Sequence, residues 1–167
     1  ENGIYLFRGG NESAHYTFEN TSGGLRSNQV FDTFVDREGV IWFGTDKGVC
    51  RFDGASPLNY LFSQDSESNF VRTLHRTKDG KIYAGLNKGL YVFDGENWLV
   101  SEDSANKSIY SIGENVENKI IIGTPTDQIR TVKNLNGKTY TAIFGKGLFE
   151  NDKLIFSHDT LITMYVE

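Results

Sequence analysis

Residues 28–54 of the chain, NQVFDTFVDREGVIWFGTDKGVCRFDG, are repeated 41 positions later by residues 69–95, NFVRTLHRTKDGKIYAGLNKGLYVFDG. Four glycines coincide in the two copies without a gap: Gly39, Gly44, Gly48 and Gly54 align with Gly80, Gly85, Gly89 and Gly95. Glycines that recur at one fixed period, at positions where strands would begin or end, indicate a chain built from structural repeats.

Each copy contains short apolar clusters of strand length. In the first copy we predict strands at 30–35, 40–45, 49–52 and 59–62, with tight turns of the type Asp46-Lys47-Gly48 between them. Two prolines, 18 glycines and no sustained 3.6-residue spacing predict almost no helix. A period of about 40 residues with four strands is typical of a blade of a β-propeller. We therefore predict an all-β chain made of four-stranded antiparallel blades.

Weaker copies extend the pattern along the chain. A third copy occupies 109–112 and 119–124, with Asn118 at the place of the turn glycine, and a fourth runs through 129–132, 136–140 and 147–152. We divide the chain into half a blade (1–23), blades at 24–66 and 67–104, a truncated blade (105–124), a blade at 125–160 and an opening strand (161–167). This division predicts that the residues form an open arc of a larger propeller. We therefore expect the arc to pack against further blades from the remainder of a larger chain.

The truncated blade is anomalous in length. Only six positions separate Gly123 from Ile129, whereas 27 separate Gly44 from Val71. A blade without its two outer strands would leave apolar faces of its neighbours in water, which is unfavourable. We interpret the difference as a strand-and-loop segment missing from this sequence, with a degenerate blade as the alternative.

Residues 25–30 and 36–53 closely resemble the two-component regulator propeller repeat. The family pattern L-S-S-N-x-V, followed by E-D-x-x-G-x-L-W-I-G-T-x-x-G-L, matches LRSNQV and DREGVIWFGTDKGV here. The resemblance covers 24–54 and 67–95 well and 108–124 and 127–150 weakly, and Ala84 and Ala142 depart from it. It implies a seven-bladed propeller that acts as the periplasmic, glycan-responsive sensor of a hybrid histidine kinase in Bacteroidetes. Similar repeats occur in a surface accessory of the type nine secretion system.

Composition and charge exclude several classes of function. A formal net charge of −5 argues against nucleic acid and anionic lipid as partners, and no apolar run is long enough to insert directly into a membrane. Cys50 lies in an apolar stretch, where a buried, inert thiol is expected. His15, His75 and His158 each stand alone, without metal-ligand spacing or a nucleophile motif. We expect no catalytic residues, no metal and no cofactor.

Ligands of propellers usually bind where the connections between blades and the turns between second and third strands meet. On that face we expect ligand-binding side chains from the connections and from a repeated turn lysine: Arg26, Asn28, Asn69, Arg72, Tyr110, Lys47, Lys88 and Lys146. A ring of lysines would suit an acidic glycan, although solvated turn lysines explain the pattern equally well. The side chains of Asn28 and Asn69 could instead fix local turns.

Three functions remain open. The first is an extracytoplasmic, periplasmic or cell-surface, ligand-sensing module of a two-component regulator that responds to a glycan or another small ligand. The second is a surface or secretion-system scaffold that binds a protein or lipopolysaccharide at the propeller face, and the third is a polysaccharide lyase. If the chain comes from Bacteroidetes, as the resemblance implies, Ser104 and Thr160 are candidate O-glycosylation sites in exposed connections.

Overall fold

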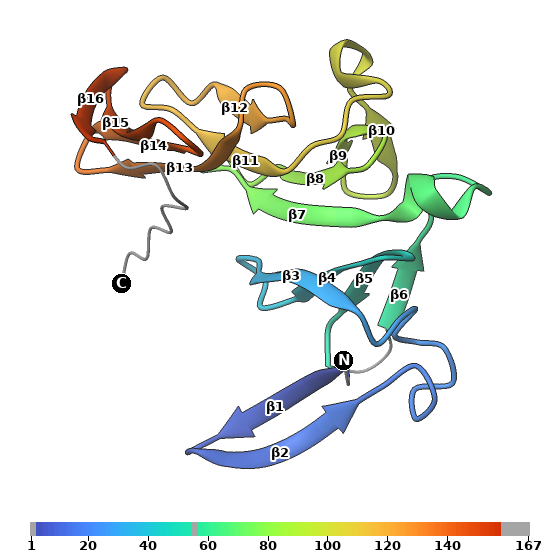
Figure 1. Cartoon of the computed structure of the whole chain (residues 1–167). Helices are drawn as coiled ribbons and strands as arrows, with labels where there is room; N and C mark the ends of the chain where they lie inside the picture. The colour runs from blue at the N-terminus through green and yellow to red at the C-terminus, as the bar shows by residue number, and fades with distance from the viewer. Residues whose placement is uncertain (1–2, 55–56, 158–167) are drawn as a thin grey trace.

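The computed structural model describes residues 3–54 and 57–157, and their five antiparallel sheets follow one another along an open arc (Figure 1). The first sheet pairs β1 (Ile4–Arg8) with β2 (Asn11–Tyr16), and the second contains β3 (Val30–Val35), β4 (Ile41–Thr45), β5 (Gly48–Phe52) and β6 (Pro57–Tyr60). The third contains β7 (Val71–Arg76), β8 (Ile82–Leu86), β9 (Gly89–Phe93) and β10 (Trp98–Val100). The fourth has β11 (Ser111–Glu114) and β12 (Ile120–Gly123), and the fifth has β13 (Ile129–Leu135), β14 (Lys138–Ile143), β15 (Gly147–Glu150) and β16 (Lys153–Phe156).

The all-β prediction is confirmed. Helical structure in the described part of the chain is confined to two 3₁₀ segments, η1 (Ser66–Asn69) and η2 (Glu102–Ser104). In each four-stranded sheet the strands lie in sequence order, as a propeller blade requires. The first half-blade is the hairpin β1–β2, while the opening strand expected at 161–167 lies outside the described residues.

Strand positions in the first complete blade agree with the sequence except at its outer edge. The first three strands begin and end within one residue of the predicted limits, but the fourth occupies 57–60 instead of 59–62. The backbone N–H groups of Phe62 and Ser63 donate to the side-chain oxygen of Asn69, at 2.7 and 3.2 Å. Phe62 therefore belongs to the connection between blades, not to the strand ladder.

Close packing between blades explains why glycine recurs in the second strand of successive repeats. A Cβ atom built on Gly44 would lie 2.8 Å from Cγ1 of Val71, and one on Gly85 would lie 2.7 Å from Cγ2 of Ile109. Val71 begins the first strand of the following blade, and Ile109 is the equivalent residue one repeat later. Both are completely buried. Glycine in the second strand of one blade thus allows the opening residue of the next blade to pack against its backbone.

The truncated repeat forms a two-stranded sheet, as its short length in the sequence predicts, and the interpretation of a missing segment stays a prediction. The carboxylate of Asp127 accepts the N–H groups of Thr124 and Ile129, at 2.8 and 3.1 Å, and closes a compact turn from β12 directly into β13. The turn before β12 uses Asn118 at φ 59°, the left-handed conformation that glycine adopts in the other repeats.

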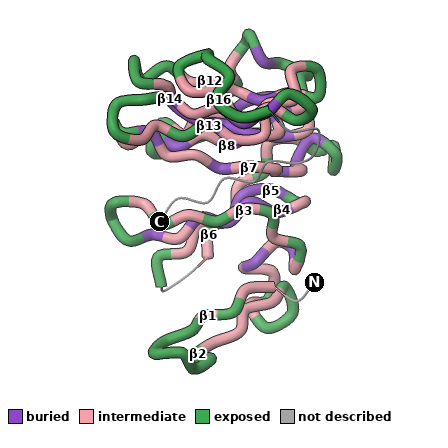
Figure 2. The backbone as a smooth tube through the Cα atoms, turned by 60° about the vertical axis from the view of Figure 1, so that its left-hand side comes forward, coloured by how far each residue is buried: buried purple, intermediate pink, exposed green. Residues whose placement is uncertain are grey.

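The main core lies between the two complete blades, and the buried segments of β4, β5, β7 and β8 face one another there (Figure 2). Trp42 is only 1% exposed, packs on the rings of Phe93 and Trp98 from the next blade, and donates from Nε1 to Asp36 at 2.7 Å. Among the apolar residues of the first two strands of each blade, Trp42 and Ile82 are buried, whereas others are half-buried: Val30, Phe34, Ile41, Tyr83, Ile120, Ile122 and Tyr140.

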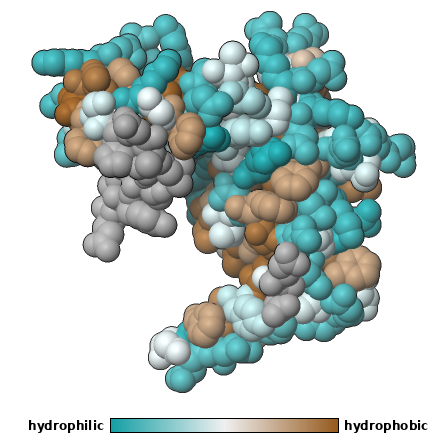
Figure 3. All heavy atoms as spheres, in the orientation of Figure 1, coloured by the Kyte–Doolittle hydropathy of each residue, from teal (hydrophilic) through white to brown (hydrophobic). Residues whose placement is uncertain are grey.

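A second apolar region lies between the hairpin β1–β2 and the first complete blade. It contains a hollow of about 510 Å³ lined by residues such as Ile4, Leu25, Phe43 and Phe52. Figure 3 shows apolar atoms collected at this junction, whereas hydrophilic side chains dominate the outer loops. Cys50 is buried beside it, as predicted, and its thiol donates to the carbonyl of Gly24 with a sulfur–oxygen distance of 3.3 Å.

Candidate functional site

A β-bulge lies at the second residue of three opening strands. The pairing register shifts between Val30 and Asp32 in β3, and equivalent shifts occur at Arg72 in β7 and at Arg130 in β13. The residue at each shift has no partner in the ladder, and a bulge turns its side chain away from the regular alternation. Phe31, Arg72 and Arg130 are therefore presented from the same place in three blades.

These bulge residues belong to one continuous row of contacts that crosses four sheets. The ring centres of Phe31 and Phe70 are 4.5 Å apart, and the guanidinium carbon of Arg72 lies 5.0 Å from the Phe70 ring centre. The Tyr110 ring centre lies 4.6 Å from the guanidinium carbon of Arg72 and 5.5 Å from that of Arg130. Phe144 ends the row, 5.3 Å from Arg130. We call Phe31, Phe70, Arg72, Tyr110, Arg130 and Phe144 the cation–aromatic row.

The row borders a groove of about 620 Å³ along the innermost strands of the arc. Its lining comes from β3, β7, β11 and β13 together with Tyr110. Four cationic side chains line it, Arg72, Arg76, Arg130 and Lys133, against the single carboxylate of Asp32. The groove is therefore electropositive although the chain carries a net charge of −5.

The two arginines of the row are positioned by neutral side chains. Nε of Arg72 donates to the side-chain oxygen of Asn87 at 2.6 Å, and a terminal nitrogen of Arg130 donates to the side-chain oxygen of Gln128 at 2.9 Å. Nε of Arg130 is buried without a hydrogen-bond partner. No described carboxylate forms an ion pair with either arginine.

Titratable groups also meet deeper along the innermost strands. Burial raises the pKa of Asp32, although the N–H groups of Leu74 and Thr33 donate to its carboxylate at 2.7 and 2.8 Å. Burial lowers the pKa of His75, whose Nε2 lies 3.7 Å from a carboxylate oxygen of Glu114. The same Glu114 oxygen accepts the N–H of Lys78 at 3.0 Å. Both carboxylates thus have backbone donors as partners.

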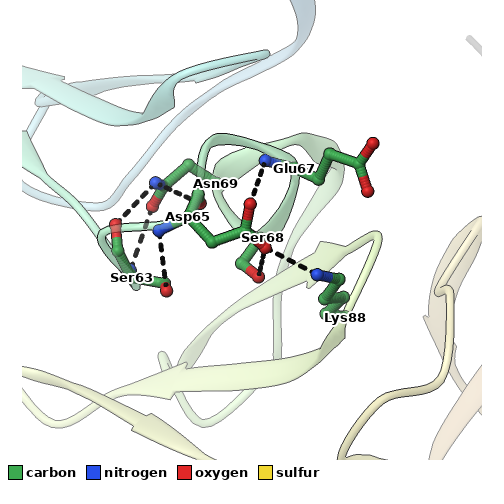
Figure 4. A network of polar contacts seen from close by, with 6 residues as sticks. All are labelled: Ser63, Asp65, Glu67, Ser68, Asn69 and Lys88. Atoms are coloured by element: carbon green, nitrogen blue, oxygen red, sulfur yellow. Dashed lines mark hydrogen bonds and ion pairs between the residues drawn. The ribbon is translucent and has the colours of Figure 1, made fainter.

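The expected ring of turn lysines does not form a common site. Nζ of Lys88 pairs with Asp65 at 2.6 Å, an interaction that lowers the pKa of Asp65 to about 2 (Figure 4). Lys47 and Lys146 are exposed, and neither lines the groove beside the row. The lysines are therefore solvated turn residues, the alternative considered from the sequence.

The two asparagine candidates have structural roles. Asn69 is 5% exposed, and its amide accepts from two backbone N–H groups and donates to the carbonyls of Ser63 and Asp65 (Figure 4). Asn28 accepts the N–H of Phe18 at 2.7 Å and donates to Glu19 at 3.0 Å. Both side chains organise the connections between blades, as the alternative considered from the sequence expects.

The remaining candidates fall into two separate places. Arg72 and Tyr110 meet in the cation–aromatic row, whereas Arg26 and Lys47 line a smaller hollow of about 260 Å³ around Asn28. The sequence-based set missed Arg130, Phe31, Phe70 and Phe144. Phe31, Arg72 and Arg130 all occupy the second position of an opening strand, so comparison of the repeats at that position would have found three members of the row.

The expectation that Ser104 is exposed is wrong. Its side chain is 2% exposed, its hydroxyl accepts the N–H of Leu90 at 3.0 Å, and it donates to the carbonyl of Ser101 at 2.8 Å. This hydroxyl ties the end of one blade to its third strand and offers no room for a glycan. Thr160 lies outside the described residues.

In the described parts of the chain no helix could span a membrane, and no group of His, Cys, Asp or Glu there could hold a metal ion. Comparison with known proteins gave a family match and a structural match. Residues 24–47 match the family model "two component regulator propeller". No curated protein matches the chain.

Among solved structures, the chain is similar to the extracellular domain of a hybrid two-component system from B. thetaiotaomicron. The TM-score is 0.66 and the sequence identity 23%, and the match covers 88% of this chain and 24% of that one. The chain thus spans about a quarter of the length of that extracellular domain. The resemblance found in the sequence is confirmed: the chain has a blade segment similar to the two-component regulator propeller repeat, set in a similar propeller fold.

Proposed function

We propose that the chain is part of the extracytoplasmic sensor propeller of a two-component regulator, in the periplasm or at the cell surface. Its signal is a glycan that binds in the groove beside the cation–aromatic row. The proposal assigns a binding role and no catalytic step. The row carries the proposal, because it gathers aromatic faces and hydrogen-bond donors on the inner strands of successive blades.

The chemistry of the row suits a saccharide. The exposed ring of Phe31 can pack against the C–H face of a sugar ring, and the hydroxyl of Tyr110 and the free guanidinium N–H groups of Arg72 can donate to its oxygens. A groove of about 620 Å³ lies within the range of small-molecule sites. The matched repeat and the similar extracellular domain support the placement in a two-component system.

The test is binding of oligosaccharides to the full-length protein, measured by calorimetry after a screen on a glycan array. We expect Tyr110→Ala to weaken binding about tenfold or more, a loss of roughly 1.4 kcal/mol or more. Lys47→Gln, which changes an exposed side chain outside the groove, should leave affinity unchanged. If no oligosaccharide on the array binds, or if Tyr110→Ala binds as tightly as the native protein, the proposal is wrong.

A further inference from the structure

The positive charges of the cation–aromatic row are not neutralised by ion pairs with the described residues. Arg72 and Arg130 both lie over the ring of Tyr110, within 4.6 and 5.5 Å of its centre. Two like charges against one ring repel each other, and partial removal from water increases that repulsion. Because acidic residues are in surplus in the whole chain, it is more informative that no described carboxylate forms an ion pair with either arginine.

Two carboxylates of the innermost strands, those of Asp32 and Glu114, already have partners. Asp32 accepts two backbone N–H groups, and Glu114 accepts the N–H of Lys78 and lies against His75. The neutral oxygens of Asn87 and Gln128 hold the two arginines in place without neutralising them. Arg76, farther along β7, also has a buried guanidinium nitrogen without a hydrogen-bond partner. The arginines of the groove can therefore bind an anionic group that the described residues do not supply.

We propose that the ligand of the cation–aromatic row is an acidic saccharide, whose carboxylate or sulfate groups are bound by the guanidinium groups of Arg72 and Arg130. This inference rests on the proposed function and specifies its ligand class. Guanidinium groups suit the role, because their planar N–H pairs match the two oxygens of a carboxylate or sulfate. The aromatic members of the row then contact the uncharged parts of the sugar.

The experiment compares acidic and neutral oligosaccharides with the same backbone on the full-length protein. The probes are trigalacturonate and triglucuronate, their methyl esters, and sulfated and unsulfated galactose disaccharides. We expect at least one acidic form to bind about tenfold or more tightly than its neutral counterpart. The carboxylate and sulfate arms identify which anion is preferred. Raising NaCl from about 50 to 500 mM should weaken acidic ligands far more than neutral ones.

Substitutions of the two arginines test where the anionic group of the saccharide binds. Arg72→Gln and Arg130→Gln should each remove most of the preference for the acidic form, while Lys47→Gln, with the same loss of charge outside the groove, should keep it. Arg72→Lys retains the charge but not the planar donor pair, and should give an intermediate preference. Thermal unfolding midpoints of all variants check that the blades remain folded.

The possible failures are distinct. Equal or tighter binding of the neutral forms, or an acidic preference that survives Arg72→Gln and Arg130→Gln in folded proteins, overturns the acidic-ligand inference and leaves the glycan sensor in place. Absence of binding by every saccharide, both in these pairs and on the array, overturns the proposed function itself.

Discussion

Ile109, the first residue of the truncated repeat, packs directly against the backbone of Gly85 in the preceding blade, where a built Cβ would lie 2.7 Å from its Cγ2 atom. The same relationship joins Val71 to Gly44 one repeat earlier. A side chain cannot be added at these glycines without moving an entire blade edge, because the facing atoms belong to buried residues.

Gly85→Ala should therefore destabilise the protein by about 1–3 kcal/mol through overpacking. Urea unfolding measures this loss. The double variant Gly85→Ala/Ile109→Ala should be more stable than the sum of the single changes predicts, because the new methyl group partly fills the space left by Ile109. Strict additivity would show that the two residues do not meet.

Trp42→Ala should cost about 3–5 kcal/mol of unfolding free energy, since the indole fills the core between two blades. Leu58→Ala is the control: Leu58 is 50% exposed, and its truncation should change stability by no more than about 0.5 kcal/mol. A loss below about 1 kcal/mol for Trp42→Ala in a denaturant melt would contradict the assigned core.

The thiol of Cys50 should be unreactive in the folded protein. Burial raises its pKa to about 11, so almost no thiolate exists at pH 8, and the side chain is nearly inaccessible. A thiol-reactive dye should label the native protein far more slowly than the protein in 6 M guanidinium chloride. Comparable rates in the two states would show that this interior opens readily.

His75 should make stability depend on pH just below neutrality. Because its folded pKa lies below the ordinary value of 6.5, protonation favours the unfolded chain. The stabilising contribution is complete above pH 6.5 and is lost as the pH falls through the folded pKa. His75→Gln should reduce the drop in urea midpoint between pH 7 and pH 5, whereas Glu114→Gln should lower the His75 pKa further in an NMR titration. An unchanged pH profile for His75→Gln contradicts this assignment.

The sequence predicted the strands well because each repeat carries its own turn and interblade residues. Glycine and asparagine favour the left-handed conformation that Gly39 and Asn118 adopt in turns, so these residue types indicate turns in the sequence. The large apolar side chain of Trp42 likewise indicates a core position. The fourth strand was misplaced because the side chain of Asn69, several residues later, binds the backbone at Phe62. The compact turn from β12 into β13 was not predicted, because the closing role of Asp127 depends on hydrogen bonds that periodicity does not reveal.

The candidate site was only partly predictable. Arg72 and Tyr110 were included because they lie next to the connections between blades, but Arg130 was hidden in a weak copy of the repeat. Exposure was misjudged at Ser104, whose hydroxyl is used internally, and Lys88 was considered without its partner Asp65. Such pairings join residues from different parts of the chain, so the three-dimensional structure was needed to identify them.

The bulges remove Phe31, Arg72 and Arg130 from the pairing of the strands, so the identity of these side chains does not affect the sheet. A bulge residue has no opposite partner in the strand ladder, so its side chain can change from aromatic to cationic while the sheet keeps the same pairing. The row already contains both kinds at equivalent positions. If the row binds its ligand as proposed, a substitution at this one position of a repeat changes the ligand preference without disturbing the blade.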